Sequence, residues 1–412
     1  MEPGVYAGRT LGQEDWLALR SKVIFEACKW DVQSEDHSVL AGFPLLIESE
    51  TVEFLQRTAE ALSQEALSAE QEIVKQPKLL RRLGLPRKIR CALRECENSG
   101  SSPQNLRVMR FDFHFTSQGW RISEVNADVP GGLIEASDWN SLFADALSGV
   151  SAPTNTSEMY AQAICDAVGS GGFAALVHAT AYSDDRQVMR HLSLYLKKKG
   201  IEACLVSPAH IHWVDGSAEI RSAYASGCPR ILVRFFPAEW LPNLPNKDSW
   251  QPYFSGSKTA LSNPGSAIIL QTKRFPLVWD ELKSDLSTWR TLLPKTREAN
   301  YIKSMLDDYS ILKPALGRVG EGIGMPGITP KDELAEIFWS ARQNPMEWVA
   351  QERFAAVPIA TEKCALYPCL GVFTIGGKAA GFYGRVAERP IIDQNAQDAA
   401  VLIIETARGE IQ

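Results

Sequence analysis

The sequence predicts a mixed α/β fold of two or three packed lobes, and three observations support this. The chain has 412 residues, about twice the length of a usual single domain. Residues 49–76 space their apolar side chains as a helix does, whereas residues 171–240 alternate short apolar runs with one longer polar run. With 45% apolar and 22% charged residues, the composition is that of a globular protein, which argues against extensive disorder and fibrous repeats.

The N-terminal segment, residues 1–105, is predicted to be mainly helical. Its strongest signal is a set of apolar residues at alternating spacings of three and four, which predicts one amphipathic helix over residues 49–76. Pro77 follows this helix, and the polar run CENSGSSPQN, residues 96–105, predicts a loop. The apolar positions are Val52, Leu55, Ala59, Leu62, Ala66, Ala69 and Ile73.

Three further regions complete the predicted organisation. Residues 106–165 begin with a charged hairpin and continue into helices. Residues 166–245 read as strand GGFAALVHAT, helix DDRQVMRHLSLYLKKKG and strands IEACLVSP and PRILVRFF, which predicts a small parallel α/β lobe. Residues 255–412 mix helices with short strands such as YSILKPA, WVAQERF and CLGVFTIGGKAAGFYGRV.

Charge and cysteine content exclude several classes of partner and location. A formal net charge of −6 and an isoelectric point near 5.7 give no long-range attraction for nucleic acid or an anionic membrane. No apolar stretch approaches the roughly 20 residues that cross a bilayer, and the first residues do not read as an export signal. The eight cysteines lack CxxC spacing, which favours reduced thiols in the cytoplasm. The oligomeric state is left open.

The stretch RFDFHFTSQGWRISEVNADVPGG, residues 110–132, concentrates charge on what reads as a strand, a turn and a strand. In its first strand, aromatic and polar residues alternate, so the rings face one side and the polar groups the other. The aromatic set is Phe111, Phe113 and Phe115, and the polar set is Arg110, Asp112 and His114.

The turn sets the register of this hairpin. A three-residue turn over 117–119, with Gly119 in the left-handed region, pairs Thr116 with Trp120. Carried back, this register places Asp112 opposite Glu124, Arg110 opposite Asn126 and His114 opposite Ile122.

Two carboxylates on directly opposed strand positions repel each other unless a cation or a proton lies between them. Mg²⁺ takes one or two carboxylates together with phosphate oxygens, so Asp112 and Glu124 suit it. The alternative is a solvated hairpin in which Arg110 neutralises one of the acids. His114 is interpreted as a supporting residue.

A glycine-rich stretch, ILKPALGRVGEGIGMPG at residues 311–327, follows a predicted strand. Backbone amides of such a loop can close over phosphates while Lys313 supplies a positive charge, although the P-loop pattern is lacking. A plain surface loop is the alternative. Arg385 follows a glycine hairpin, where an exposed charge at the end of a strand is the commoner case.

In this order and separation, the motifs resemble the synthetase part of glutathionylspermidine synthase and its relatives among the ATP-grasp ligases. The resemblance covers residues 107–401, and its most specific parts are RFDFHF with ISEVNAD, KPALGRVGEG, and AGFYGR with PII. It implies a permuted ATP-grasp fold with a small Rossmann-like substrate lobe. It also implies an ATP-dependent, ADP-forming ligase that joins a small-molecule carboxylate, an amino acid or small peptide, to an amine through an acyl phosphate.

The resemblance also implies roles for individual residues. Mg²⁺ would be held by Asp112, Glu124 and Asn126, with Arg110 at the acyl phosphate and Arg385 steadying the transition state. ATP would be bound by Lys273 and Lys313, by the phosphate loop at Val319 and Gly320, by the adenine-binding strand at Gln351, Glu352, Arg353 and Phe354, and by a second nucleotide contact at Pro390, Ile391 and Ile392.

The chain departs from the family pattern on the substrate side. EVNAD continues as VPGGLIEAS without the serine of the glutathione-using enzymes, and Phe235 stands where a threonine is expected. Asp184 and Asp185 match a pair of acids near the family's substrates and could attract an amine, although acids at the start of a helix commonly just offset its dipole. Glutathione is therefore in doubt as the substrate.

Three functions remain compatible with the sequence. A ligase is expected first, without amide hydrolysis, because the helical N-terminal segment leaves no room for the amidase of the bifunctional family members. It could equally join an amino acid in natural-product biosynthesis without using glutathione. The second function is a phosphotransferase that stops at the phosphorylated product, and the third is a non-catalytic nucleotide-binding protein.

Overall fold

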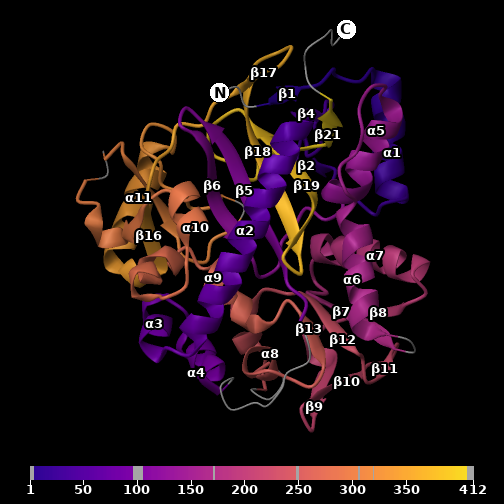
Figure 1. The fold of residues 1–412 in the computed structure, drawn as a ribbon, viewed down its shortest axis with the longest axis vertical. Coiled ribbons are helices and arrows are strands. Elements are labelled where there is room, and N and C mark those ends of the chain that lie inside the picture. The colour runs from indigo at the N-terminus through magenta and orange to yellow at the C-terminus, as the bar shows by residue number, and fades with distance from the viewer. Residues whose placement is uncertain are drawn as a thin grey trace.

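The central element is a six-stranded antiparallel sheet in the order β20-β19-β18-β5-β6, with β17 pairing with β18 (Figure 1). The structure is a computed structural model that describes residues 4–95, 105–169, 172–246, 250–304, 307–318 and 320–405. The sheet joins the charged hairpin to the C-terminal hairpin, about 250 residues later. Its strands are β5 (Val108–Thr116), β6 (Gly119–Asn126), β17 (Ile359–Ala360), β18 (Ala365–Ile375), β19 (Lys378–Ala387) and β20 (Gln397–Ala399).

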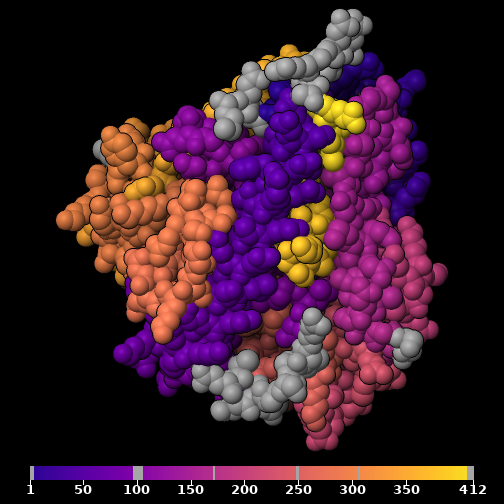
Figure 2. All heavy atoms as spheres, viewed as in Figure 1, coloured from indigo at the N-terminus to yellow at the C-terminus, as the bar shows by residue number. Residues whose placement is uncertain are grey.

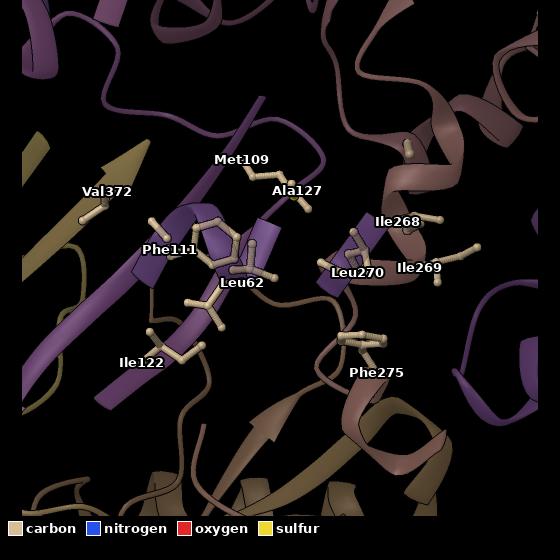
Figure 3. Close-up of a cluster of buried hydrophobic side chains, with 14 of the residues drawn as sticks. Leu62, Met109, Phe111, Ile122, Ala127, Ile268, Ile269, Leu270, Phe275 and Val372 are labelled. Carbon is tan, nitrogen blue, oxygen red and sulfur yellow. The ribbon is translucent and has the colours of Figure 1, made fainter. Parts of the chain in front are cut away.

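One long helix, α2 (Ser49–Val74), crosses the face of this sheet (Figures 1 and 2), and it forms within the 49–76 segment where the sequence predicted an amphipathic helix. All seven apolar residues of the predicted stripe are buried. Figure 3 shows Leu62 of α2 beside Phe111 and Ile122 of the hairpin, with Phe275 and the short helix α9 (Ile268–Gln271) further along the same core. The aromatic face of β5 therefore packs into the core beneath α2, which leaves the opposite face for the polar residues.

The N-terminal segment also contributes strands. β4 (Leu45–Glu48) lies between β1 (Val5–Ala7) and β21 (Val401–Ile404), and it pairs in parallel with β21. Residues near the start and the end of the described chain thus share one small sheet. The remaining N-terminal elements are α1 (Gln13–Phe25), β2 (Gln33–Ser34), β3 (His37–Ser38), α3 (Pro77–Arg82) and α4 (Arg87–Glu95).

A four-stranded parallel sheet in the order β13-β12-β7-β8 forms the small lobe at the lower right of Figure 1. Three of its strands come from residues 166–245, and the fourth, β13, comes from further along the chain. Its elements and their neighbours are α5 (Asn140–Ala146), α6 (Thr156–Val168), β7 (Phe173–His178), α7 (Ser183–Lys198), β8 (Glu202–Val206), β9 (Ile211–Val214), β10 (Ser217–Arg221), β11 (Ser226–Gly227), β12 (Ile231–Phe235) and β13 (Ala260–Ser262).

A three-stranded antiparallel sheet in the order β14-β16-β15 forms the lobe at the left of Figure 1, next to α11. Its two longer strands lie within YSILKPA and WVAQERF, as predicted. No helix in the described ranges is long and apolar enough to span a bilayer. The elements of this part, with the nearby α10, are α10 (Ser287–Leu292), β14 (Thr296–Glu298), β15 (Ser310–Pro314), α11 (Lys331–Gln343) and β16 (Trp348–Glu352). The short helix α8 (Pro252–Ser255) lies elsewhere, against α4.

The turn of the charged hairpin differs from the predicted one. Thr116 pairs with Gly119 across a two-residue turn, so the predicted pairing of Thr116 with Trp120 is wrong. The register then shifts between Asp112 and Phe113, because β6 contains one extra residue at this point. This bulge restores the predicted pairs further along, so that Asp112 lies opposite Glu124. Before the bulge, His114 pairs with Arg121, not Ile122.

Candidate active site

Arg110 and Asp112 form a buried ion pair on the polar face of β5. Arg110 Nε and Nη2 donate to the two Asp112 carboxylate oxygens at 2.7 and 2.8 Å, and Asn126 Nδ2 donates to Asp112 Oδ2 at 3.1 Å. Both side chains are about nine-tenths buried, so this face of the hairpin is not solvated. Burial disfavours the charged guanidinium, but the adjacent carboxylate outweighs it and raises the pKa of Arg110. Arg110 does neutralise one of the two acids, as in the alternative prediction, but this ion pair is buried and not solvated.

Two lysines from distant segments surround Glu124. Lys273 Nζ lies 3.0 Å from Glu124 Oε2 and donates to the Gly317 carbonyl at 2.7 Å. Lys313 Nζ donates to the carbonyl of Ser123 at 3.2 Å and to Gln351 Oε1 at 2.8 Å. The predicted ATP lysines therefore meet at the predicted metal carboxylate.

The charges in this group shift one another's pKa. Burial opposes ionisation of Glu124, but Lys273 and then Lys313 outweigh it and lower the pKa of Glu124 to about 2. Burial, only partly offset by Glu124, lowers the pKa of Lys313 to about 8. Burial also lowers the pKa of His114 to about 4, and the charge of Lys313 acts in the same direction. His114 is therefore neutral at pH 7, and its Nε2 lies 3.1 Å from Ser123 Oγ.

The glycine-rich loop borders a cavity of about 430 Å³. One wall is residues 320–323, and the other is the connection between β19 and β20 at residues 389–395. Gly320 has a φ of 68°, and a Cβ there would lie 2.3 Å from the carbonyl oxygen of Ile392, so only glycine fits this close approach. Gly320 and Ile391 both line the cavity, with Pro390 and Ile392 flanking Ile391 in the chain. Val319 lies outside the described residues.

The four residues of the predicted adenine-binding strand have different surroundings. Gln351 is buried, binds Lys313 and Thr296, and lines a second, small cavity together with Glu124 and Lys273. The Glu352 carboxylate pairs with Arg297 at 2.9 Å, and its backbone N–H donates to Lys295 O at 2.9 Å.

The other two residues, Arg353 and Phe354, follow the end of β16 at Glu352, so the strand is shorter than predicted. Arg353 donates from Nη1 to Pro326 O at 3.2 Å, and its backbone N–H to Tyr309 O at 2.9 Å. The ring of Phe354 lies 5.3 Å from that of His114. Among the residues that the structure describes, Gln351 is therefore the one of these four whose side chain lies beside Glu124 and the two lysines.

Arg385 approaches the hairpin from β19. Its Nη2 donates to the carbonyl of Asp393 at 2.7 Å, and its Nε lies 3.8 Å from Asp398 Oδ1. Burial disfavours the charge of Arg385, but Tyr383 and Asp398 outweigh it and raise its pKa. Tyr383 also lies under Arg110, whose Cζ is 4.9 Å from the centre of the ring. Tyr383 thus links the two predicted catalytic arginines, which the sequence did not indicate.

Asp184 and Asp185 lie in the first turn of α7. Burial, with a smaller contribution from the charge of Asp184, raises the pKa of Asp185 to about 6, against the effect of the Ala179 backbone N–H. The charge of Arg318, from the glycine-rich loop, also lowers it. The structure therefore brings Asp185 near this loop, while Asp184 is exposed.

The sequence interpretation did not include Arg318 and its partners. Arg318 pairs with Glu239 at 2.5 Å, and its Nη2 lies 3.7 Å from Asp128 Oδ2. Asp128 is fully buried and pairs with Arg234 at 2.5 Å. Asp128 could have been found from the sequence, because it is the last residue of the motif EVNAD. Its partners lie more than 100 residues away along the chain, and no sequence pattern connects them to it.

Comparison with known proteins decides the family. The model of the glutathionylspermidine synthase preATP-grasp family matches residues 25–403. The chain belongs to this family. The resemblance drawn from the sequence motifs is thereby confirmed. Among curated proteins, no sequence matches the chain.

Comparison with solved structures gives matches of different strength for this member of the glutathionylspermidine synthase preATP-grasp family. A glutathione synthetase-like effector from Globodera pallida, in its apo form, has a TM-score of 0.63 and 13% identity, covering 95% of this chain and 96% of that chain. A putative gamma-glutamylcysteine synthetase from Methylobacillus flagellatus has a TM-score of 0.39 and 14% identity, covering 77% and 83%. The first likeness confirms the predicted mixed α/β fold of the ATP-grasp type.

The residues on the hairpin fit a divalent cation in their chemistry. Asp112 and Glu124 are directly opposed, and Asn126 adds an amide on the same face. Carboxylate and amide oxygens are ligands for Mg²⁺. Among the described residues there is no cluster of three or more His, Cys, Asp or Glu that could hold a metal, so phosphate or water oxygens would have to complete the set. Arg110 and Lys273 now compensate the two carboxylates that the ion would bind.

Proposed function

We propose that the chain is an ATP-dependent, ADP-forming ligase that joins a small-molecule carboxylate to an amine. The observation that supports this most is the buried charge group around one hairpin. Arg110, Lys273 and Lys313 bring three cations to Asp112 and Glu124, and Arg385 lies on β19 of the same sheet, within a fold of the ATP-grasp type. Several cations beside two opposed acids match a triphosphate that carries a divalent ion.

The reaction proposed has two steps. An oxygen of the substrate carboxylate attacks the γ-phosphorus of ATP, the bond to the β-γ bridging oxygen breaks, and ADP leaves. The amine nitrogen then attacks the acyl carbon, loses a proton, and displaces phosphate. Negative charge develops on oxygens in both steps, so fixed cations that are already buried stabilise both transition states without reorganising.

Each group of residues has a role in this proposal. Lys273 and Lys313 bind the phosphates, while Arg110 and Arg385 stabilise charge at the transferred phosphoryl group. Asp112, Glu124 and Asn126 would hold Mg²⁺, which supplies Lewis-acid stabilisation of phosphoryl oxygens when bound. The loop at Gly320 closes over ATP and excludes water from the acyl phosphate. The backbone of Gln351–Phe354 would hold adenine, and Pro390–Ile392 would make a second contact with the nucleotide.

The substrates proposed are an amino acid or small peptide as the carboxylate and a small amine. Asp185 and Asp184, at the N-terminus of α7, would attract the amine. The family departures at 129–137 and at Phe235 lie on this substrate side and argue against glutathione. We also propose that residues 4–95, which pack onto the synthetase through α2 and β4, do not themselves hydrolyse the product.

A screen for ADP release tests the proposal. The purified protein is incubated with ATP and Mg²⁺ against amino acids, glutathione and short peptides, each with and without amines, and products are identified by mass. We expect release that depends on both a carboxylate and an amine. Release that needs no amine would indicate a phosphotransferase, and no release with any pair would count against the ligase.

Two variants and a matched control complete this test. Asp112→Asn and Glu124→Gln should abolish turnover. Asp280→Asn also removes a carboxylate paired with an arginine, at 2.8 Å from Arg290, but on the surface, and it should leave turnover unchanged. Full activity in both hairpin variants would refute the metal assignment.

A further inference from the structure

A buried lysine of the N-terminal segment, Lys29, lies on the other side of the Asp398 carboxylate from Arg385. It follows Cys28, whose φ of 64° turns the chain after α1. Its Nζ contacts three carboxylates: Asp31 at 2.9 Å, Asp398 at 3.1 Å and Glu135. The side chain of Lys29 is 4% exposed, so a fully buried cation is held by this cluster. No motif of the proposed ligase site includes Lys29.

Asp398 connects this lysine to Arg385. In the sheet, Asp398 on β20 lies directly opposite Arg385 on β19. Its Oδ2 binds Lys29 and its Oδ1 accepts from the Tyr383 hydroxyl at 2.6 Å. Arg385 Nε is 3.8 Å away, beyond hydrogen-bond distance, and has no hydrogen-bond partner although it is buried. An unpartnered buried N–H of an arginine is costly, which indicates that a ligand oxygen completes it.

Tyr383 carries the connection on to Arg110. Its hydroxyl is fixed by Asp398, and its ring lies under the Arg110 guanidinium at 4.9 Å. The Arg110 guanidinium is also held at another of its nitrogens, because Nη1 donates to the Gly131 carbonyl at 2.6 Å. The Asp398 carboxylate therefore lies beside Arg385 and holds the tyrosine under Arg110, while Asp112 and the Gly131 carbonyl hold the Arg110 guanidinium itself.

We propose that Lys29 is a positioning residue for Arg385, acting through Asp398. With Lys29 in place, the charge of Asp398 is compensated, and Arg385 Nε stays free for the phosphoryl or acyl oxygen of the substrate. Without Lys29, the buried carboxylate takes the nearest cation, which is Arg385, and draws its guanidinium out of the site. This inference rests on the proposed function for the role of Arg385.

The test compares Lys29→Met, Asp398→Asn and the double variant. Lys29→Met should lower kcat on the order of a hundredfold with little change in KM for ATP, because a misplaced transition-state group affects chemistry more than binding. Adding Asp398→Asn removes the charge that captures Arg385, so the double variant should recover most of the lost kcat. If Lys29 only stabilised the fold, the double variant would have no higher kcat than Lys29→Met.

A crystal structure of Lys29→Met provides a readout that does not depend on activity. We expect the distance from Arg385 Nε to Asp398 Oδ1 to shorten from 3.8 Å to hydrogen-bond range, about 3 Å. If Lys29→Met does not fold, Lys29→Gln is used in the same way. The matched control is Lys378→Met, which removes an exposed lysine 3.5 Å from Glu60 and should change neither kcat nor this distance.

The outcomes separate the two proposals. Wild-type protein without ATP-dependent ligation would contradict the proposed function, while the distance in the variant still tests the positioning role. An active wild type together with an unchanged kcat in Lys29→Met would overturn the inference. The inference would also be overturned if the distance from Arg385 to Asp398 were unchanged in Lys29→Met. The same holds if the double variant recovered none of the lost kcat.

Discussion

Replacing Asp112 with asparagine removes the charge that compensates Arg110, at almost unchanged side-chain volume. The carboxylate now accepts two hydrogen bonds from the guanidinium, and both groups are buried. Removing one partner of a buried pair leaves an uncompensated charge, which typically costs 3–5 kcal/mol. Because asparagine keeps one acceptor and Tyr383 still lies under Arg110, we expect a loss of about 3 kcal/mol in the free energy of unfolding.

The matched surface variant isolates the effect of burial. Asp280→Asn removes a carboxylate that is 2.8 Å from Arg290, but the Asp280 side chain is 91% exposed. An exposed pair contributes about 0–1 kcal/mol, so this variant should unfold like the wild type. Both free energies are measured by urea denaturation in the absence of nucleotide and metal, with tryptophan fluorescence as the signal. Equal stability of the two variants would refute the argument that the hairpin pair is desolvated.

Three further predictions follow from the same geometry. Lys313→Met should weaken binding of ATP, measured by calorimetry, by about tenfold to a hundredfold, because one buried charge-assisted contact to phosphate is lost; unchanged affinity would contradict the role of this lysine. Gly320→Ala should raise KM for ATP more than Gly327→Ala does, since both have a positive φ but only the first Cβ would strike the Ile392 carbonyl; equal effects would contradict the close approach. Asp185→Asn should stabilise the protein above pH 6 by on the order of 1 kcal/mol, because a pKa raised to about 6 in the folded state means that the ionised carboxylate opposes folding, and solvent screens part of this effect at a partly exposed group. That gain should be lost as the pH falls to about 4, where the carboxyl is protonated in the folded protein; a gain that persists at pH 4 in urea denaturation would contradict it.

The sequence predicted local features better than the contacts between distant segments. The stripe of α2 was predicted in full, because helical spacing is a property of one short stretch. The opposition of Asp112 and Glu124 was also predicted, but from a turn that was one residue too long. The bulge in β6 compensates for the shorter turn, and alternation of side chains alone gives no signal for such an extra residue.

The partners of the charged residues could not be read from the sequence. Lys29 and Asp398 are 369 residues apart, and they meet because β20 joins the edge of β19 beside the N-terminal segment. Tyr383 stands two residues before Arg385, yet its contact with Arg110 depends on β18 lying between β5 and β19. These contacts are set by the register of strands from both ends of the chain, so they required the structure.

A crystal structure with Mn²⁺ and a non-hydrolysable ATP analogue tests the central claim most directly, because anomalous scattering locates the metal. We predict the ion between the carboxylates of Asp112 and Glu124, with the phosphates on Lys273 and Lys313. An ion bound elsewhere, with both acids still paired to Arg110 and Lys273, would contradict the account.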